Sequence, residues 1–325
     1  MNRTLEDIRS SFETYLSLIG MPGEPEQLYA PFAYAMSGGG KRLRPSLLLA
    51  AYDLYADDLA PALPAAAAVE IFHNFTLLHD DVMDNAMVRR GRPSVYAKWG
   101  LNTALLSGDV MLIAAYMLLQ RTPVHHLMPR LLEIFNTMAV QVCEGQQYDM
   151  EFEGRSKITV VEYMHMIELK TSALLCGAVQ LGAVLGGASD EDFRKLSRFA
   201  TEIGLAFQVQ DDLLDCYGDE SLLGKRIGGD ILEGKKSFMT IMAMSLADRE
   251  QREVLRSTHL DKSLTDEEKI SRVKGVYDAL GVPRIAEQQI SSRFDRALAL
   301  LGTLKGAGST QMLASLASGL IGRSK

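Results

Sequence analysis

Residues 73–84 read HNFTLLHDDVMD and residues 207–215 read FQVQDDLLD, and in each an apolar segment ends in Asp-Asp-x-x-Asp. Residues four apart share a helical face, so the outer aspartates of each cluster project together. Such carboxylates repel one another, and the helix dipole disfavours them at a C-terminus, so a cation has to compensate them. Oxygen ligands without cysteine favour a hard ion, above all magnesium. The six carboxylates are Asp80, Asp81, Asp84, Asp211, Asp212 and Asp215.

Three glycine-rich basic segments accompany these acids: GGGKRLRP at 38–45, RRGRP at 89–93 and GKRIGGD at 224–230. Glycines let the backbone approach a phosphate, and Lys or Arg can clamp its oxygens. The first segment is not a Walker A loop, because Lys41 is followed by Arg42. A single acidic cluster is more often a solvated helix end, and alternating charges can be plain surface ion pairs. Two clusters with three basic loops instead indicate diphosphate held between metal ions and guanidinium groups.

The fold class follows from helical periodicity across the 325 residues, 47% of which are apolar. No sustained alternation indicates a sheet, so we expect one all-α domain over 1–325, a single large helical bundle around a central cavity. A net charge of −7 with no dominant basic face argues against nucleic acid as a partner. The predicted helices cover roughly 5–19, 45–55, 65–84, 101–120, 128–150, 160–186, 191–217, 236–247 and 283–304.

Two observations bear on location. The chain has three cysteines without metal-ligand spacing and no apolar signal core at its start, so we predict a reduced, cytoplasmic protein. Residues 171–189 are uncharged and near the length that spans a bilayer. Their four glycines and one glutamine favour a helix buried among other helices, and we predict no transmembrane segment.

The motifs, in this order over about residues 36–240, resemble the trans-isoprenyl diphosphate synthase (polyprenyl synthetase) family, in its short-chain branch. The resemblance implies a prenyltransferase that condenses isopentenyl diphosphate with dimethylallyl, geranyl or farnesyl diphosphate by ionisation, condensation and elimination. It also implies small-molecule diphosphate substrates, a homodimer, and Mg²⁺ as cofactor, with three ions per site. Water would quench the cation, so the site has to close, and segment 218–234 is the lid candidate.

The resemblance also assigns roles to individual residues. It assigns binding of isopentenyl diphosphate to Lys41, Arg44, His73 and Arg90. It assigns binding of the allylic diphosphate to Arg89, Lys170, Thr171, Gln208, Lys225 and Lys235. Among these, the implied catalytic residues are Lys170, Thr171 and Gln208. The magnesium ligands are Asp80, Asp81, Asp84, Asp211 and Asp215; Asp80, Asp84 and Asp211 are the principal ones, with Asp81, Asp212 and Asp215 in support.

Product length depends in this family on the fourth and fifth residues before the first aspartate, which are Thr76 and Phe75 here. Thr76 lies about one helical turn from Asp80, whereas Phe75 points roughly 140° round. A small residue beside a bulky one favours geranylgeranyl diphosphate as the product, with farnesyl diphosphate as the alternative.

Three other classes stay open from the residues. A class I terpene cyclase shares the first aspartate motif, but its second motif normally mixes Asn, Ser or Thr with Glu. A non-catalytic partner subunit would not need both complete clusters. A di-iron carboxylate oxidase would use two Glu-x-x-His pairs on helices, at Glu70/His73 and Glu162/His165, with Glu133 or Glu144. That reading leaves both aspartate clusters and every basic loop unexplained.

Overall fold

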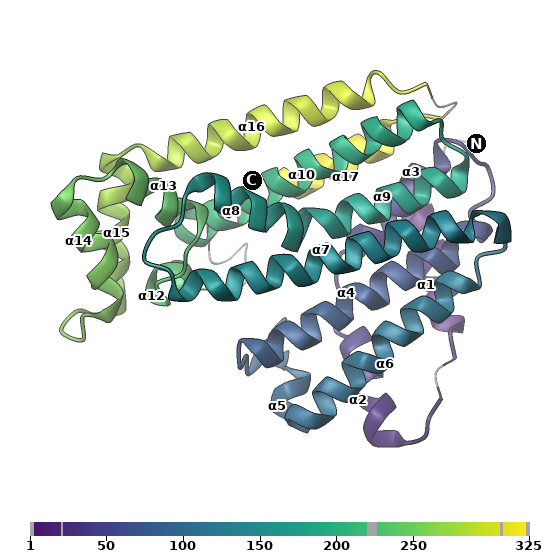
Figure 1. Ribbon diagram of the computed structural model, residues 1–325, viewed down its shortest axis with the longest axis horizontal. Helices are drawn as coiled ribbons and strands as arrows, with labels where there is room; N and C mark the ends of the chain where they lie inside the picture. The colour runs from purple at the N-terminus through teal and green to yellow at the C-terminus, as the bar shows by residue number, and fades with distance from the viewer. Residues whose placement is uncertain (1–2, 21, 220–225, 306–307, 323–325) are drawn as a thin grey trace. The chain divides into compact units, whose positions relative to one another are not determined.

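The structure, a computed structural model, describes residues 3–20, 22–219, 226–305 and 308–322 (Figure 1). Within these ranges the regular elements are helices apart from one short antiparallel hairpin, β1 (Val88–Arg89) with β2 (Arg92–Pro93). The predicted all-α fold is therefore confirmed.

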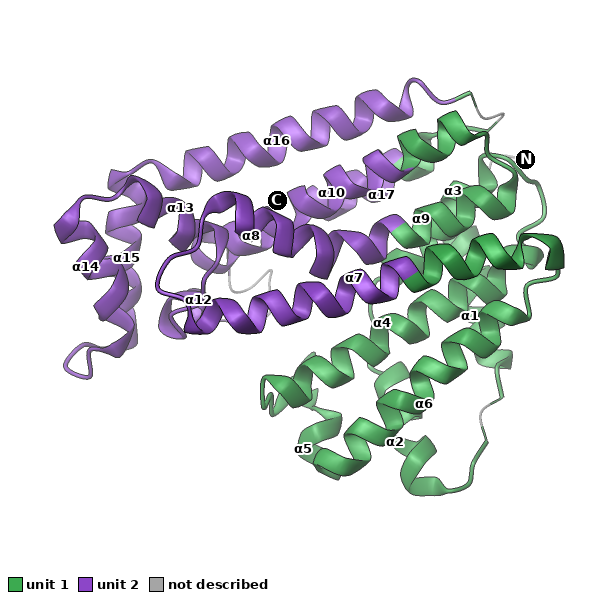
Figure 2. Ribbon diagram, in the orientation of Figure 1, with its two compact units in different colours: residues 1–136, 177–196, 305–313 green, residues 137–176, 197–304, 314–325 purple. Residues whose placement is uncertain are grey.

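The chain forms two compact units, coloured separately in Figure 2. Unit 1 comprises residues 1–136, 177–196 and 305–313, and unit 2 comprises 137–176, 197–304 and 314–325. Three of the long helices and the last one contribute residues to both units. The prediction of a single domain over 1–325 stays a prediction.

Unit 1 is built around a central helix that carries the first aspartates. Alanines 65–68 on this helix, α4, are completely buried, and such small side chains permit close approach of the helices packed on it. The partners of α4 include α2, α3 and α6. The elements that begin in unit 1 are α1 (Leu5–Leu18), α2 (Glu26–Met36), α3 (Leu43–Asp53), η1 (Ala60–Ala62), α4 (Leu63–Met83), α5 (Val95–Trp99), α6 (Leu101–Gln120), η2 (His125–Leu127), α7 (Met128–Gly154) and α10 (Asp190–Tyr217).

Unit 2 has its own apolar core, in which Phe238, Met239 and Tyr277 are almost fully buried. Three of its helices begin with reciprocal caps: Thr159 with Glu162, Asp248 with Gln251, and Thr265 with Glu268. The elements that begin in unit 2 are α8 (Val160–Ile167), η3 (Glu168–Ser172), α9 (Ala173–Gly186), α12 (Gly229–Leu232), α13 (Phe238–Leu246), α14 (Arg249–Ser257), η4 (Thr258–Leu260), α15 (Asp266–Ala279), α16 (Val282–Leu301); α17 (Gln311–Ile321) begins in unit 1 and ends in unit 2.

Every predicted range coincides with an observed helix to within a few residues, but α2, α5, α12, α14, α15 and α17 were not predicted. Helix α2 was not predicted because Pro31 lies inside it. Helix α14, REQREVLRS, has only two apolar residues, Val254 and Leu255, which is too few for a recurring apolar position to be seen. The segment expected to be a buried helix at 171–189 does pack inside the chain as α9.

Two stretches are long and apolar enough to cross a membrane by length and composition alone, Leu101–Gln120 and Val160–Gly186. The second stretch is 67% buried inside the protein, as the core helix of a folded domain would be, and the first is 39% buried.

Candidate functional site

The first aspartate cluster (Asp80, Asp81, Asp84) ends helix α4 in unit 1. Asp81 is buried, and its carboxylate pairs with Arg89 of the hairpin at 2.6 Å. Burial raises the pKa of Asp81, while the Arg89 guanidinium opposes that shift. Arg89 reaches Asp80 more loosely, at 3.2 Å. Asp81 therefore anchors the hairpin to the helix, whereas Asp80 and Asp84 are the more accessible carboxylates.

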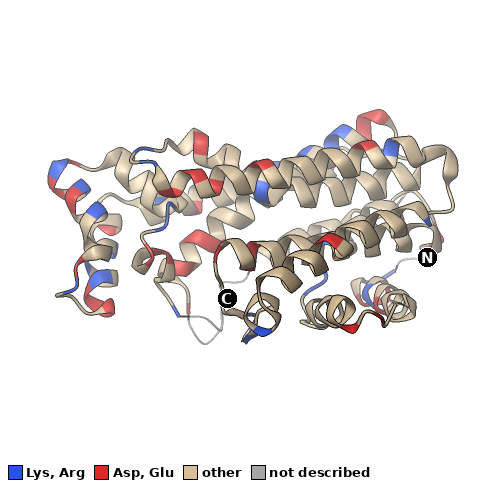
Figure 3. Cartoon of the chain, turned by 60° about the horizontal axis from the view of Figure 1, so that its bottom comes forward, with Lys and Arg blue, Asp and Glu red and all other residues tan. Residues whose placement is uncertain are grey.

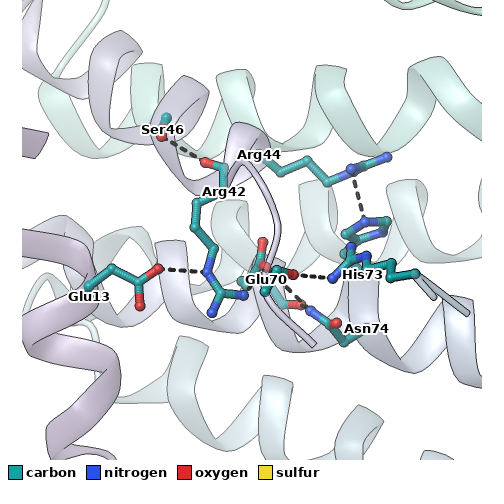
Figure 4. A network of polar contacts seen from close by, with 9 residues as sticks. Glu13, Arg42, Arg44, Ser46, Glu70, His73 and Asn74 are labelled. Atoms are coloured by element: carbon teal, nitrogen blue, oxygen red, sulfur yellow. Dashed lines mark hydrogen bonds and ion pairs between the residues drawn. The ribbon is translucent and has the colours of Figure 1, made fainter. Parts of the chain in front are cut away.

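A concentration of positive charge lies one to two turns earlier on α4, around His73. Nη1 of Arg44, on the first turn of α3, donates to Nε2 of His73 at 3.0 Å (Figure 4). Burial, together with the charges of Arg44, Arg90, Arg89 and Arg42, holds the pKa of His73 well below its usual range. The imidazole is therefore neutral, and its Nε2 accepts the hydrogen bond from Arg44.

Arg44 itself is buried and only partly hydrogen-bonded. Burial and the charge of Arg90 lower its pKa to about 10, so the guanidinium stays charged at neutral pH. Its Nε is buried and has no hydrogen-bond acceptor in the part of the chain that the structure describes. A buried donor without an acceptor costs free energy, and a phosphate oxygen would satisfy it. Basic and acidic positions are otherwise interspersed along the ribbon (Figure 3).

A buried ion pair fixes the backbone that presents Arg44. Arg42 adopts a left-handed conformation (φ 46°, ψ 40°) immediately before α3. Its guanidinium donates at 2.7 Å both to Glu70 on α4 and to Glu13 on α1 (Figure 4). Glu70 also accepts from the Asn74 side chain. The unusual backbone at Arg42 is thus held by two carboxylates from two other helices.

The second aspartate cluster (Asp211, Asp212, Asp215) lies in unit 2, late in α10, and its members differ in their contacts. Asp212 is buried and accepts hydrogen bonds from the Tyr163 hydroxyl, the Phe238 backbone N–H at 2.7 Å and Gln208. Burial nevertheless raises the pKa of Asp212 to about 6.

The other two aspartates of the second cluster, Asp215 and Asp211, differ in whether the protein itself engages their carboxylates. Asp215 is buried and accepts from the Asp230 backbone N–H at 3.0 Å, which ties α10 to the start of α12. The half-buried carboxylate of Asp211 makes no hydrogen bond or ion pair with any residue that the structure describes. Asp212 and Asp215 are therefore occupied by the fold, while Asp211 is available to a ligand.

Lys170 and Thr171 lie on a π-helical turn, η3, between α8 and α9. Lys170 Nζ pairs with Asp149 Oδ2 of α7 at 2.5 Å, and Thr171 donates to Gln208 Oε1 at 3.1 Å. Gln208 in turn donates to Asp212, so the turn is hydrogen-bonded to the second cluster. Single π turns in helices occur frequently at functional sites.

Two glycines allow neighbouring helices to approach this turn. A Cβ atom on Gly145 of α7 would overlap the backbone nitrogen of Lys170. A Cβ atom on Gly204 of α10 would lie 2.5 Å from the Ser172 hydroxyl. Any larger residue at either position would push α7 or α10 away from the turn.

The two predicted length-determining residues differ in surroundings. Phe75 is buried on the same face of α4 as His79, whose ring lies 4.7 Å away, and also contacts Phe72. Thr76 is half-buried and donates to the His73 carbonyl at 2.8 Å. Since α4 is a regular helix here, Thr76 shares a stripe with Asp80, and Phe75 does not.

Comparison with known proteins decides the family. Residues 25–279 match polyprenyl synthetase over most of the chain. The chain belongs to the polyprenyl synthetase family. A geranylgeranyl diphosphate synthase of Methanosarcina mazei is 45% identical over 222 residues, 67% of this chain and 68% of that protein. A geranylfarnesyl diphosphate synthase of Natronomonas pharaonis is 39% identical over 238 residues, 68% and 70% of the two chains. A crystal structure of a geranylgeranyl pyrophosphate synthase matches with a TM-score of 0.91 at 37% identity, over 100% of both chains.

The family match confirms the resemblance that the sequence motifs indicated, and with it the helical fold. It also confirms the enzyme class, which is a prenyltransferase. The structure brings the predicted residues of that family together within each unit. Unit 1 gathers Arg44, His73, Arg89, Arg90 and the first cluster, with Lys41 exposed in the loop before α3. Unit 2 gathers Lys170, Thr171, Gln208, Lys235 and the second cluster. Lys225 and part of the lid candidate lie outside the described residues.

The sequence did not point to several residues that position this synthetase site: Arg42, Asp149 and Tyr163. Glu70, which directly follows the apolar run 63–69 of α4, was a usable signal, because a buried carboxylate needs a partner. That partner is Arg42, not a metal. Glu162, from the other Glu-x-x-His pair, caps α8 and binds Arg155 at 2.5 Å. Both contacts, like the family match, contradict the di-iron alternative.

Proposed function

We propose that the chain is a magnesium-dependent short-chain trans-prenyltransferase that joins isopentenyl diphosphate to an allylic diphosphate and releases geranylgeranyl diphosphate. The observation that carries the proposal is Arg44, a buried cation with an unsatisfied Nε–H, in a group of arginines close to an acidic cluster. A diphosphate supplies the oxygens that this group lacks, and Lys41 and Arg90 lie in the flanking basic loops.

The carboxylates suit the proposed metal. Asp80 and Asp84 share a face at the end of α4, and Asp211 has an unengaged carboxylate, so these three are the proposed principal ligands. Arg89 neutralises Asp81, and hydrogen bonds occupy Asp212 and Asp215, so we propose that these three support the ligands. Hard oxygen donors without sulfur fit Mg²⁺. When bound, magnesium would offset the charge of the leaving diphosphate.

The proposed reaction breaks the allylic C–O bond, and the electron pair leaves with the diphosphate. The double bond of isopentenyl diphosphate then forms the new carbon–carbon bond, and loss of a proton restores a double bond. Arg44, Arg90 and Lys41 hold one diphosphate; Arg89, Lys170, Lys225 and Lys235 hold the other. Thr171 and Gln208 are proposed to orient oxygen dipoles toward the developing cation. Positioning of the two reactants supplies much of the rate.

The test supplies isopentenyl diphosphate and Mg²⁺ with dimethylallyl, geranyl or farnesyl diphosphate, and identifies the products by chromatography. We expect geranylgeranyl diphosphate from each primer, and loss of turnover on addition of EDTA. No elongation with any primer would refute the function. A product that stops at farnesyl diphosphate would replace the length assignment by the farnesyl alternative, and activity that survives EDTA would remove the metal.

Phe75→Ala is expected to lengthen the main product by at least one isoprene unit. The reason is that Phe75 fills space beside His79 one turn before the first aspartate, and its truncation opens that space to the growing chain. Product distribution by mass spectrometry measures the effect. Phe193→Ala, on α10, removes a partly buried ring that contacts Arg130 of α7 and should leave the product unchanged. An unaltered product from Phe75→Ala would remove Phe75 as the floor.

We further propose a cytoplasmic homodimer. Helix α6 exposes a stripe of large apolar side chains, with Leu105 40%, Ile113 57% and Met117 54% exposed. Their spacing of four to eight residues places them on one face. The exposed Asp109 interrupts this stripe between Leu105 and Ile113. An exposed, mainly apolar stripe is still typical of an interaction surface, and a two-fold interface uses the same stripe twice.

Ile113→Glu is therefore expected to weaken the dimer by about two orders of magnitude, since two carboxylates would be buried without partners. Light scattering with size-exclusion chromatography measures the change at micromolar concentration. Val161→Glu, which alters a valine 79% exposed on α8, is the control and should stay dimeric. A monomeric native chain, or an Ile113→Glu dimer of native stability, would contradict this interface.

A further inference from the structure

Unit 2 contains a cavity that the proposed reaction does not use. Its volume is about 680 Å³, within the range of sites that bind drug-sized molecules. The loop between α7 and α8 forms one side, and α12, α13, α14, η4 and α15 form the others. None of the catalytic or metal-binding residues proposed above lines it.

The rim of this cavity is strongly basic. Its described lining residues include five Lys or Arg side chains and one acid, Asp230. Asp230 already has a cationic neighbour, Lys235, at 3.8 Å. The basic side chains are Arg155, Lys157, Lys236, Arg252 and Arg256.

Three of these cations are uncompensated. Arg155 pairs with Glu162, and Arg252 donates to the Met244 carbonyl at 3.3 Å. Lys157, Lys236 and Arg256 make no ion pair within the described ranges of the chain. The whole protein has a net charge of −7, so the unpaired cations make the surroundings of this cavity positive where the protein as a whole is negative. The cavity therefore attracts a ligand with more than one negative charge.

The floor of the cavity is apolar. Ile231, Ile241, Leu255 and Val273 line it and are each at most 8% exposed. The one buried phenol in the lining, Tyr277, has its hydroxyl engaged by Thr240 at 2.8 Å. Such a floor offers hydrocarbon contact and no unsatisfied polar group, so it suits an alkyl or alkenyl chain.

The cavity and the second aspartate cluster are neighbours, since Asp230 lines the cavity and donates its backbone N–H to Asp215, and two successive lysines differ in which of them they face. Burial lowers the pKa of Lys235, but Asp230, Asp149, Glu233 and Asp212 outweigh that effect and raise it. Lys236, the next residue, lines the cavity, where its charge adds to burial in lowering the pKa of His259. Lys235 thus lies among the acidic residues near the second cluster, whereas Lys236 adds a positive charge to the cavity.

We propose that this cavity is a second, non-catalytic site for an amphiphile with a phosphorylated head group and an apolar chain. A diphosphate matches three uncompensated cations better than a singly charged carboxylate, and guanidinium binds phosphate oxygens in pairs. The choice of a prenyl diphosphate as the ligand rests on the proposed function, since the chain would release such a compound.

Calorimetric titration of the full chain in EDTA tests the proposal, because EDTA removes the magnesium that the aspartate clusters are proposed to hold and so weakens competing diphosphate binding there. The probes are geranylgeranyl diphosphate and inorganic diphosphate. We expect Lys157→Ala/Arg256→Ala to weaken geranylgeranyl diphosphate binding at least about tenfold, since two charge-assisted contacts are lost. The matched control, Lys262→Ala/Arg249→Ala, removes one Lys and one Arg outside the cavity and should change binding less than about twofold.

The two probes also distinguish a lipid-like ligand from a free anion. We expect inorganic diphosphate to bind at least about tenfold more weakly than geranylgeranyl diphosphate, because it leaves the apolar floor uncovered. Equal affinities, no binding by the native chain, or native binding by the cavity variant would each overturn the proposal. The elongation assay separates the two hypotheses: a chain that elongates prenyl diphosphates but fails this titration retains the proposed function and loses only the second site.

Discussion

Asp211→Asn is expected to lower kcat by about two to three orders of magnitude, the scale on which loss of one electrostatic contact to a developing charge slows an enzyme. Asparagine has nearly the same shape, so the substitution removes the charge and leaves helix α10 intact. Asp211 has no protein partner among the described residues, so its carboxylate contributes nothing visible to the fold.

The measurement is kcat over a magnesium titration, and half-maximal activity should require a higher Mg²⁺ concentration in the variant. Asp57→Asn is the control: Asp57 is an exposed carboxylate in the loop after α3, and its loss should leave both quantities unchanged. A kcat for Asp211→Asn within about tenfold of native would show that this carboxylate does not hold the metal.

Glu70→Gln should lower the free energy of unfolding by about 3 kcal/mol, because it leaves the buried Arg42 guanidinium without its principal counter-charge. The Glu70 and Arg42 side chains are 4% and 10% exposed. Glu13 contacts the same guanidinium from a position 51% exposed, so Glu13→Gln is a matched control and should cost less than about 1 kcal/mol. Urea unfolding measures both.

The pair also has a kinetic consequence, because Arg42 sets the backbone from which Arg44 projects. Glu70→Gln should raise KM for isopentenyl diphosphate more than KM for the allylic substrate. Equal destabilisation by the two glutamate variants would mean that the buried pair is not the anchor of this loop.

Sequence patterns predicted the features that depend on residues close together in the chain, namely helices, acidic clusters and basic loops. The apolar period located α4 and α10, and the acidic clusters closed them as expected. The basic loops were recognisable because glycine, lysine and arginine together have few structural uses. Beyond about residue 245, α16 was predicted, but α14 and α15 were missed, since about half of their residues are charged and they bury few side chains.

Contacts between distant residues were beyond this kind of reasoning. Tyr163 and Asp212 are 49 positions apart, and Arg42 and Glu70 are 28 apart. Neither a sequence period nor a motif indicates which of several possible donors will bind a given buried carboxylate. That choice is made by how the helices pack. The same limit explains why Asp81 and Asp215 were placed in supporting metal roles without their protein partners, Arg89 and the Asp230 backbone, being foreseen.

The π turn at Glu168–Ser172 has a consequence for how the chain tolerates changes in length. A π turn is an α-helix with one residue added, so deletion of one residue here would restore a regular helix and keep α8 and α9 in register. A deletion elsewhere in this helix would rotate everything beyond it by about 100°. The five residues of η3 are therefore the place where a shorter chain could fold as well as before. That chain would lose the present placement of Lys170 and Thr171, and with it their contacts to Asp149 and Gln208.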